Sequence, residues 1–310
     1  STKDAIFDVL KRHKGRVRKS EKSMNSEIGL PLTIIGVSNA WRNLSGWLSN
    51  IGAGLRLILT RSSYPEVLVL EVGADHPGDI ESVTKWLRPD VSVITLISKI
   101  PVHVEFFASP EAVFKEKSFL ATGVKNGGTL VLFGDDERVM TMKDLVKDRN
   151  VSIVSYGTQE GVTVRGESIN VLYEDGAPVG IGAEVCVASE RVPMSVKGIV
   201  GDTYMYPILA AVAVGKACGV DVVSSIKDLQ SYEMPRGRMN VIPGINGSTL
   251  IDDSYNSSPD AVVAALNTLK KLECSGRKVA VLGDMMELGK FAGSEHRNVG
   301  KEVAQGIDML

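Results

Sequence analysis

The sequence predicts an α/β fold built on a doubly wound, mostly parallel sheet, followed by part of a second α/β domain. Short, continuously apolar runs at 67–72, 91–97 and 129–133 are typical of strands buried on both faces of a parallel sheet. Segments with helical periodicity lie between these runs, and the same alternation starts again near residue 248. Strands that alternate with helices in this way form parallel sheets with crossover helices.

The elements of the first 150 residues follow this alternation. Residues 1–10 predict an amphipathic helix, because helix-starting residues precede apolar residues spaced 3.6 apart. Helix-start residues and helical periodicity also predict helices over 77–87 and 109–124, between the apolar runs. We therefore expect residues 1–150 to form a doubly wound sheet.

Residues 151–200 have a different character. Short strand patterns at 151–157, 168–174 and 195–199 are separated by turn signals such as Asp175-Gly176. We expect an antiparallel insertion or edge in this β-rich part. A strong helix is predicted over 203–221, ended by a glycine.

The chain then divides. Residues 231–244 contain two prolines and are predicted to be a linker. Beyond it we expect a strand at 248–253, a helix over 258–272, a strand at 278–284 and a helix over 293–306. We predict a first domain over 1–235, and over 236–310 the first half of a Rossmann-like domain.

The composition excludes several classes of protein. The net charge of −2 gives no electrostatic reason to expect nucleic acid as a partner. No apolar run approaches the roughly 20 residues of a membrane-spanning helix, so we expect no membrane insertion. The three cysteines are far apart and lack zinc-site spacing, which favours reduced thiols in a cytoplasmic protein.

Polar residues follow two neighbouring strands of the predicted sheet. Glu71 ends the strand at 67–72, and His103 follows the strand at 91–97, so both are expected at the ligand-binding edge. A carboxylate and an imidazole on one edge suit a divalent metal ion. The alternatives are that Glu71 caps the next helix and that His103 is structural. Lys115 and Lys117 lie on the following helix, where most lysines are solvated.

Two stretches in the C-terminal part also bear on function. Residues 251–261, "IDDSYNSSPDA", are either a strand-to-helix turn with a cap or a polar cluster facing the first domain. The stretch "VLGDMMELGKF" is not a P-loop, because its glycine spacing is wrong and Phe291 follows Lys290 where Ser or Thr is needed. The chain thus contains no Walker A loop.

Six blocks of sequence, in order, resemble the Mur ligase family, which builds the peptide stem of the bacterial cell-wall precursor. The blocks are "MNSEIGLPLTI", "LEVGADHPGDI", "VHVEFFASPEAVFKEK", "GRMNVI", "IDDSYNSSPDAV" and "VLGDMMELG". The last two favour the branch that adds D-alanyl-D-alanine to UDP-N-acetylmuramoyl-tripeptide. The resemblance implies the central ATPase domain of the family without its P-loop strand, with Ser1 directly behind that loop. We expect an interior part of a three-domain ligase that does not hydrolyse ATP alone.

The resemblance also implies a mechanism with ATP and Mg²⁺. A substrate carboxylate attacks the γ-phosphate of ATP to form an acyl phosphate, and an amine then displaces phosphate. Glu71 and His103 would hold Mg²⁺ together with Lys117 as a carbamate, Lys115 being the second choice for that lysine. The residues implied at the nucleotide are Arg238, Asp253, Tyr255 and Asn256. Asn25 lies in a loop that faces the acceptor substrate in the family.

The sequence departs from the family pattern in one block and leaves two alternatives. Thr203 and Pro207 stand where the family often has His and Asn, and a proline side chain cannot make the contact with the nucleotide base that the family Asn makes. One alternative is a related ligase such as a folylpolyglutamate or cyanophycin synthetase, which the last two blocks oppose. The other is a degenerate, non-catalytic relative that binds or scaffolds. Glu71, His103 and Lys117 argue against it.

Overall fold

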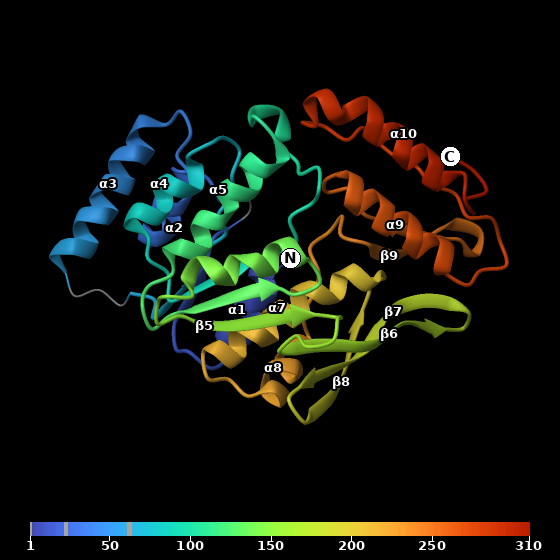
Figure 1. Cartoon of the computed structure of the whole chain (residues 1–310), viewed down its shortest axis with the longest axis horizontal. Helices are drawn as coiled ribbons and strands as arrows, with labels where there is room; N and C mark the ends of the chain where they lie inside the picture. Colours follow the sequence, from blue (N-terminus) through green and yellow to red (C-terminus); the bar gives the residue numbers. More distant parts are fainter. Residues whose placement is uncertain (1, 22–23, 61–63) are drawn as a thin grey trace.

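The computed structural model describes residues 2–21, 24–60 and 64–310, and its centre is a six-stranded mixed sheet (Figure 1). The strand order is β3-β4-β5-β6-β7-β8; the first four strands run parallel and the last three are joined antiparallel. The strands are β3 (Val91–Ile94), β4 (Thr129–Phe133), β5 (Ser152–Gly157), β6 (Val164–Glu174), β7 (Ala177–Val187) and β8 (Glu190–Lys197). The predicted α/β class with a mostly parallel central sheet is confirmed.

Helices cover both faces of the sheet. Figure 1 shows α1 and α7 behind the strands, whereas α5 and the α6 region lie in front. The helices of the first part are α1 (Thr2–Leu10), α4 (Asp79–Trp86), α5 (Pro110–Gly123), α6 (Glu137–Met140), α7 (Met205–Ala217) and α8 (Val222–Leu229). Helix α7 is apolar on all sides because α1, α8 and the sheet surround it, and Gly219 at φ +78° follows its end as predicted.

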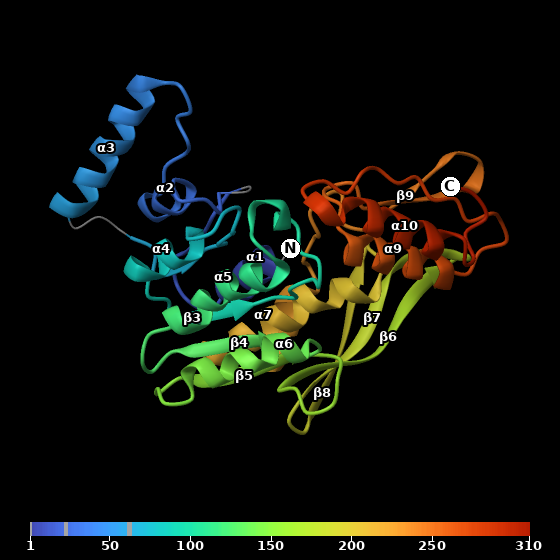
Figure 2. The ribbon, with the colours of Figure 1, turned by 45° about the horizontal axis from the view of Figure 1, so that its top comes forward.

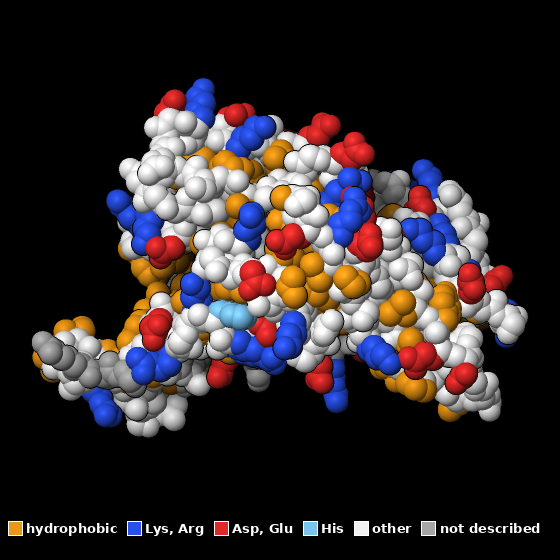
Figure 3. Space-filling view, turned by 90° about the horizontal axis from the view of Figure 1, so that it is seen from below, with side chains coloured by type: hydrophobic (Ala, Val, Ile, Leu, Met, Phe, Trp, Pro, Cys, Tyr) orange, Lys and Arg blue, Asp and Glu red, His pale blue; other side chains and the backbone are white. Residues whose placement is uncertain are grey.

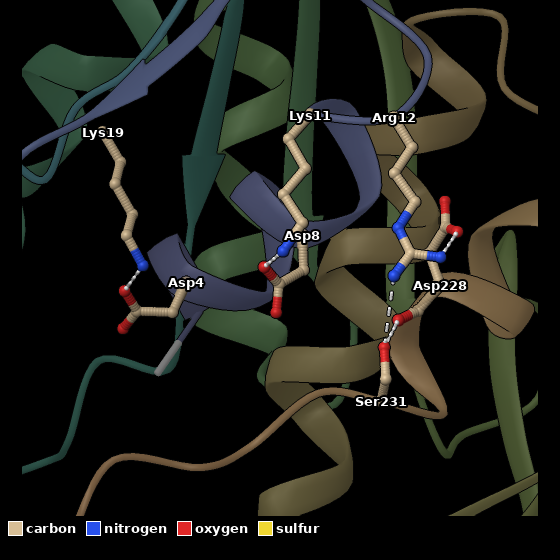
Figure 4. Close-up of polar contacts among 7 residues, drawn as sticks. All are labelled: Asp4, Asp8, Lys11, Arg12, Lys19, Asp228 and Ser231. Carbon is tan, nitrogen blue, oxygen red and sulfur yellow. Dashed lines mark hydrogen bonds and ion pairs between the residues drawn. The ribbon is translucent and has the colours of Figure 1, made fainter.

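Helix α1 packs on α7 through the apolar residues that the sequence singled out. Ala5, Ile6, Val9 and Leu10 are buried, which confirms the predicted amphipathic helix. Polar contacts lie along it and just past its end, as Figure 4 shows: Asp4 pairs with Lys19 of β1 at 2.6 Å, and Arg12, in the turn after α1, pairs with Asp228 of α8 at 3.1 Å. Helix α1 is therefore fixed both to the core and to its neighbours on the surface.

A second, small parallel sheet lies beside α1. It consists of β1 (Val17–Lys19) and β2 (Val67–Val69), with Val17 opposite Val67. Two helices connect these strands, α2 (Gly29–Ile35) and α3 (Leu44–Leu59), and the sequence analysis assigned no element to either. The predicted strand 67–72 is thus shorter than expected and ends before Glu71.

Within the β-rich part, one prediction is confirmed and one is corrected. The hairpin between β6 and β7 turns at Asp175 (φ +50°) and Gly176 (φ +77°), the backbone of a type I′ turn. Segment 151–157, however, does not belong to the antiparallel part. Its strand β5 pairs parallel with β4, because its last four residues are buried and complete the apolar interior of the parallel sheet.

The C-terminal part differs from the prediction at two strands. The end of the predicted linker forms β9 (Asn240–Pro243), which pairs antiparallel with β10 (Thr249–Asp252). The predicted strand at 278–284 is wrong for the described structure. Only a single bridge joins Val279 to Met309 there, and Val281 is 93% exposed, because no described strand lies alongside.

Two predicted helices are present in this part, α9 (Pro259–Lys271) and α10 (Ala292–Val303). They enclose a small apolar cluster, separate from the large one that runs from Ala5 to Met234. The members of the small cluster are Leu266, Ala280, Met285, Leu288, Val299 and Val303. The division after residue 235 stays a prediction. No described helix is long and apolar enough to cross a bilayer.

Candidate active site

The first candidate, Glu71, lies just past the end of β2 and faces α1. Its Oε2 is 3.2 Å from the Nζ of Lys3, whose side chain is only 8% exposed. An ammonium so deeply buried requires a nearby anion, so Glu71 neutralises Lys3 in this structure. The carboxylate thereby ties the first turn of α1 to the loop after β2.

His103 lies between two other carboxylates. Its Nδ1 contacts the Glu287 carboxylate, and its Nε2 is 3.5 Å from Oδ1 of Asp75. The backbone at His103 is left-handed (φ +67°), which directs the chain into a short 3₁₀ turn over Val104–Phe106. His103 therefore connects the loop after β2 with the C-terminal segment that carries Glu287.

Lys117 lies on α5 and differs from its neighbour Lys115, which is exposed. Burial lowers the pKa of Lys117, because desolvation disfavours the charged ammonium. Among the described residues it has no carboxylate partner within 4.0 Å. A lysine whose pKa is lowered has more of the neutral amine, which is the nucleophilic form.

Glu116, between these two lysines, was missed by the sequence analysis. It is 5% exposed, and its carboxylate accepts backbone N–H bonds from Gly78 (3.0 Å), Ile80 (2.7 Å) and Glu81 (3.0 Å) at the start of α4. Three donors and the positive end of a helix stabilise the buried charge. A signal existed: Glu116 follows the buried Val113 by three residues, and so lies on the apolar stripe of α5.

Three of the four residues implied at the nucleotide come together near β9 and β10. The guanidinium carbon of Arg238 lies 4.1 Å from the ring centroid of Tyr255. Asp253 accepts hydrogen bonds from the Tyr204 hydroxyl at 2.5 Å and from the Met239 N–H at 3.2 Å. We call Tyr204, Arg238, Asp253 and Tyr255 the junction cluster, because it joins α7 to the C-terminal part.

Electrostatics within the junction cluster are set mainly by burial. Desolvation raises the pKa of Asp253, while the bonds from Tyr204 and Met239 and the charge of Arg238 oppose that rise. Burial and the Asp253 carboxylate together raise the pKa of Tyr204, so this hydroxyl stays a donor. Asn256 lies outside the cluster: it is exposed, and its Oδ1 accepts the Ser257 N–H at 2.8 Å. The sequence analysis did not predict a role for Tyr204. The available signal was a polar tyrosine hydroxyl directly before the apolar residues of α7.

Asn25, the residue implied at the acceptor substrate, borders the loop that follows Glu71. Its carbonyl accepts the Gly73 N–H at 3.2 Å. It lines a cavity of about 250 Å³ together with Asp75, His76 and Asp79. A Cβ at Gly73 would lie 2.5 Å from Nδ2 of Asn25, so a larger residue at position 73 would displace the Asn25 side chain.

The predicted metal ligands have other partners in this structure. Glu71 pairs with Lys3, whereas His103 contacts Asp75 and Glu287. In the described ranges, no group of three or more His, Cys, Asp or Glu side chains is arranged to hold a metal ion. The donor types suit a divalent cation. The assignment of a metal to them stays a prediction, and we derive no reaction step through a metal.

Comparison with known proteins gives the decisive observation. Residues 1–215 match the Mur ligase middle domain, and residues 237–310 match the Mur ligase, glutamate ligase domain. The chain belongs to the Mur ligase family. The expected α/β ligase fold of this Mur ligase is thereby confirmed, as is the resemblance drawn from the six blocks.

Individual relatives narrow the comparison. The chain is 27% identical to the UDP-N-acetylmuramoyl-tripeptide--D-alanyl-D-alanine ligase of Bacillus subtilis, over 98% of the chain and 58% of that protein. It is 25% identical to the Escherichia coli protein of the same name, over 86% of the chain and 57% of the relative. This Mur ligase chain thus spans less than two thirds of the relatives' length.

Solved structures agree in fold. The crystal structure of MurF ligase from Thermotoga maritima in complex with ADP has a TM-score of 0.78 and 27% identity, covering 99% of this chain and 62% of that one. A MurF structure from Acinetobacter baumannii has a TM-score of 0.80 at 23% identity, covering 99% and 60%. The second likeness concerns the fold alone.

Proposed function

We propose that this Mur ligase adds D-alanyl-D-alanine to UDP-N-acetylmuramoyl-tripeptide, with ATP as the phosphoryl donor and an acyl phosphate as intermediate. The observation that carries the proposal is the similarity over 98% of the chain to a Bacillus subtilis protein named for that reaction. The matched span includes every residue that the sequence analysis assigned to a site. A relative of 27% identity whose structure holds ADP supports ATP as the nucleotide.

On this proposal the junction cluster contacts the nucleotide. The Arg238 guanidinium, held over the Tyr255 ring, offers a fixed positive charge for phosphate oxygens. Both Tyr204 and Met239 donate to Oδ1 of Asp253, so Oδ2 would be the oxygen that accepts from a hydroxyl of the ligand. Asn256 is exposed beside the cluster, where its amide is accessible to a ligand.

We further propose Mg²⁺ as the metal and Lys117 as a carbamate ligand beside Glu71 and His103. The amine of Lys117 would add to CO₂ with loss of one proton, which replaces a cation by an anion. Its lowered pKa supports this reaction, because only the neutral amine attacks CO₂. Metal binding would require Lys3 to release Glu71, and His103 to exchange a carboxylate partner.

The test uses the protein encoded by the complete reading frame. It is incubated with ATP, MgCl₂, UDP-N-acetylmuramoyl-tripeptide and D-alanyl-D-alanine, and products are followed by mass spectrometry. We expect the tripeptide to gain D-alanyl-D-alanine minus one water, with ADP and phosphate released in equal amounts. Addition of glutamate instead would favour the folylpolyglutamate type of ligase. Nucleotide binding without any product would favour the non-catalytic alternative.

Matched lysine variants test the assignment on α5. Lys117→Ala should lower kcat at least about a hundredfold, because a charge in the phosphoryl-transfer site is lost. Lys115→Ala, two residues away and exposed, should retain activity. Carbon NMR with labelled bicarbonate should show a carbamate signal that is absent in Lys117→Ala. Equal losses in both variants would contradict the assignment of Lys117.

A further inference from the structure

Helix α3 stands away from the body of the molecule, as Figure 2 shows. None of its residues is buried. It is nevertheless a well-formed helix: the Asn43 side chain accepts the Gly46 N–H at its start, and the Trp47 indole donates to the Trp41 carbonyl at 2.9 Å. One side of the helix approaches α2: a Cβ built on Gly54 would lie 3.7 Å from Cδ1 of Ile35. The projection therefore has an ordered structure and a free side.

The free side is a continuous apolar stripe. Residues spaced three and four apart line one face of the helix over its whole length. The stripe consists of Leu44, Leu48, Ile51, Leu55, Ile58 and Leu59, each between 54% and 81% exposed. Trp41, at 81% exposed, extends it at the N-terminal end. Exposed apolar surface of this extent on an ordered helix marks an interaction surface.

An apolar groove borders the stripe. It has a volume of about 310 Å³ and lies between α2 and α3, lined mainly by aliphatic side chains and Trp47. Ile51 belongs to both the groove and the stripe. A ligand that covers the stripe and has a flexible apolar chain can thus also place that chain in the groove.

The charge around the stripe indicates what covers it. Between Glu27 and Glu66 the sequence has three arginines and no acidic residue, although the whole chain has a net charge of −2. Arg42 and Arg56 are exposed near the two ends of α3. Figure 3 shows this arm projecting at the left, with hydrophobic and basic side chains on it. The segment around α3 is therefore basic and amphipathic, although the net charge of the whole chain is negative.

We infer that α3 lies on the surface of an anionic phospholipid bilayer, with its apolar stripe among the acyl chains. Arginines beside an apolar helix face are attracted to anionic headgroups, and tryptophans suit the interface between headgroups and acyl chains. A second copy of the chain would present the same arginines without a complementary acidic group on this segment. The helix lies on the bilayer and does not cross it, in keeping with its length of 16 residues.

The experiment is co-sedimentation of the full-length protein with two sets of vesicles. One set contains phosphatidylcholine alone, and the other adds phosphatidylglycerol. We expect binding to the anionic vesicles, weakened by salt, and little binding to the neutral ones. Leu48→Ser with Leu55→Ser should lower the partition coefficient at least about tenfold, because apolar area on the stripe is removed. Arg42→Glu with Arg56→Glu should abolish the preference for anionic vesicles.

A matched control and a second measurement keep the inference falsifiable. Val223→Ser changes a residue of α8 that is 56% exposed and lies outside the stripe, and should bind as the unaltered protein does. All variants should keep the unfolding midpoint of the unaltered protein, since the altered side chains are exposed. Failure to sediment with anionic vesicles would overturn the inference. So would light scattering that shows a dimer lost in the Leu48→Ser, Leu55→Ser variant. Neither result depends on the ligase reaction.

Discussion

At the scale of single residues, Glu116 stabilises the contact between α5 and the start of α4. Its buried carboxylate satisfies three N–H groups at the start of α4, which no other described side chain bonds. Glu116→Ala leaves the buried Ile80 N–H and the partly buried N–H groups of Gly78 and Glu81 without this acceptor. We expect a loss of about 3 kcal/mol in the free energy of unfolding, since charge-assisted bonds of this kind are costly to remove.

Urea denaturation measures this loss, with Glu111→Ala as the control. Glu111 is an exposed carboxylate in the first turn of the same helix, so its removal should cost much less than that of Glu116. Equal effects of the two substitutions would show that the bonds from α4 contribute nothing beyond a helix-end charge.

Lys117 makes a prediction about pH. Burial depresses its folded-state pKa below the ordinary 10.5, so between the two values the unfolded chain binds more protons than the folded one. Stability from this group therefore rises with pH through that window and levels off above 10.5. Lys117→Met should be more stable than the unaltered protein at neutral pH, and the difference should shrink as the pH rises. Denaturation in CO₂-free buffers across the window measures it; a difference independent of pH would contradict the prediction.

At the scale of elements, the hairpin between β6 and β7 depends on its turn. Gly176 has φ +77°, a conformation that costs an L-residue about 1 kcal/mol. Gly176→Ala should therefore lower the free energy of unfolding by about that amount. Gly276→Ala is the matched control, because its added Cβ meets nothing within 4 Å and its φ is not positive. Thermal unfolding distinguishes them, and a stabilising effect at both positions would contradict the turn assignment.

The same hairpin illustrates what sequence could predict. Asp175-Gly176 specifies a local conformation, and so does the spacing of apolar residues in α1, so both elements were found. Strand pairing is not local. The apolar segment 151–157 does not itself specify a parallel neighbour, and 278–284 forms no strand because no described partner lies beside it. Helix α3 was missed although Leu44, Leu48 and Ile51 have helical spacing. What the sequence does not show is that this stripe is exposed, since such stripes usually face a core.

The residues of the candidate site also fall into two groups, those that the sequence indicated and those that it did not. Sequence blocks indicated Arg238, Asp253 and Tyr255, and the structure brings these three together. Tyr204 and Glu116 were missed because their importance depends on tertiary partners: the Asp253 carboxylate for one and the start of α4 for the other. The partners of Glu71 and His103 could not be predicted either, because Lys3 and Glu287 lie far from them in sequence.

At the scale of the whole molecule, the junction cluster connects the sheet-bearing part with the C-terminal part. Tyr204 precedes the buried helix α7, whereas Asp253 follows β10, and a hydrogen bond of 2.5 Å joins them. A second connection runs from His103 to Glu287, and the Glu105 N–H donates to the Glu287 carbonyl at 3.4 Å. A nucleotide at the junction cluster would thus contact residues from both parts and favour the arrangement in which these contacts form.

Two arginines on either side of Gly237 test this role. Arg238 is partly buried against Tyr255, whereas Arg236 is exposed. In the ligase assay Arg238→Ala should raise KM for ATP between about tenfold and a hundredfold, because a fixed charge facing the phosphates is lost. Arg236→Ala should change it less than about twofold. Tyr204→Phe, which removes only the hydroxyl that holds Asp253, should have an intermediate effect on KM. If both arginine variants weakened ATP binding equally, the effect would come from the net charge of the segment, and the junction cluster would not be the nucleotide site.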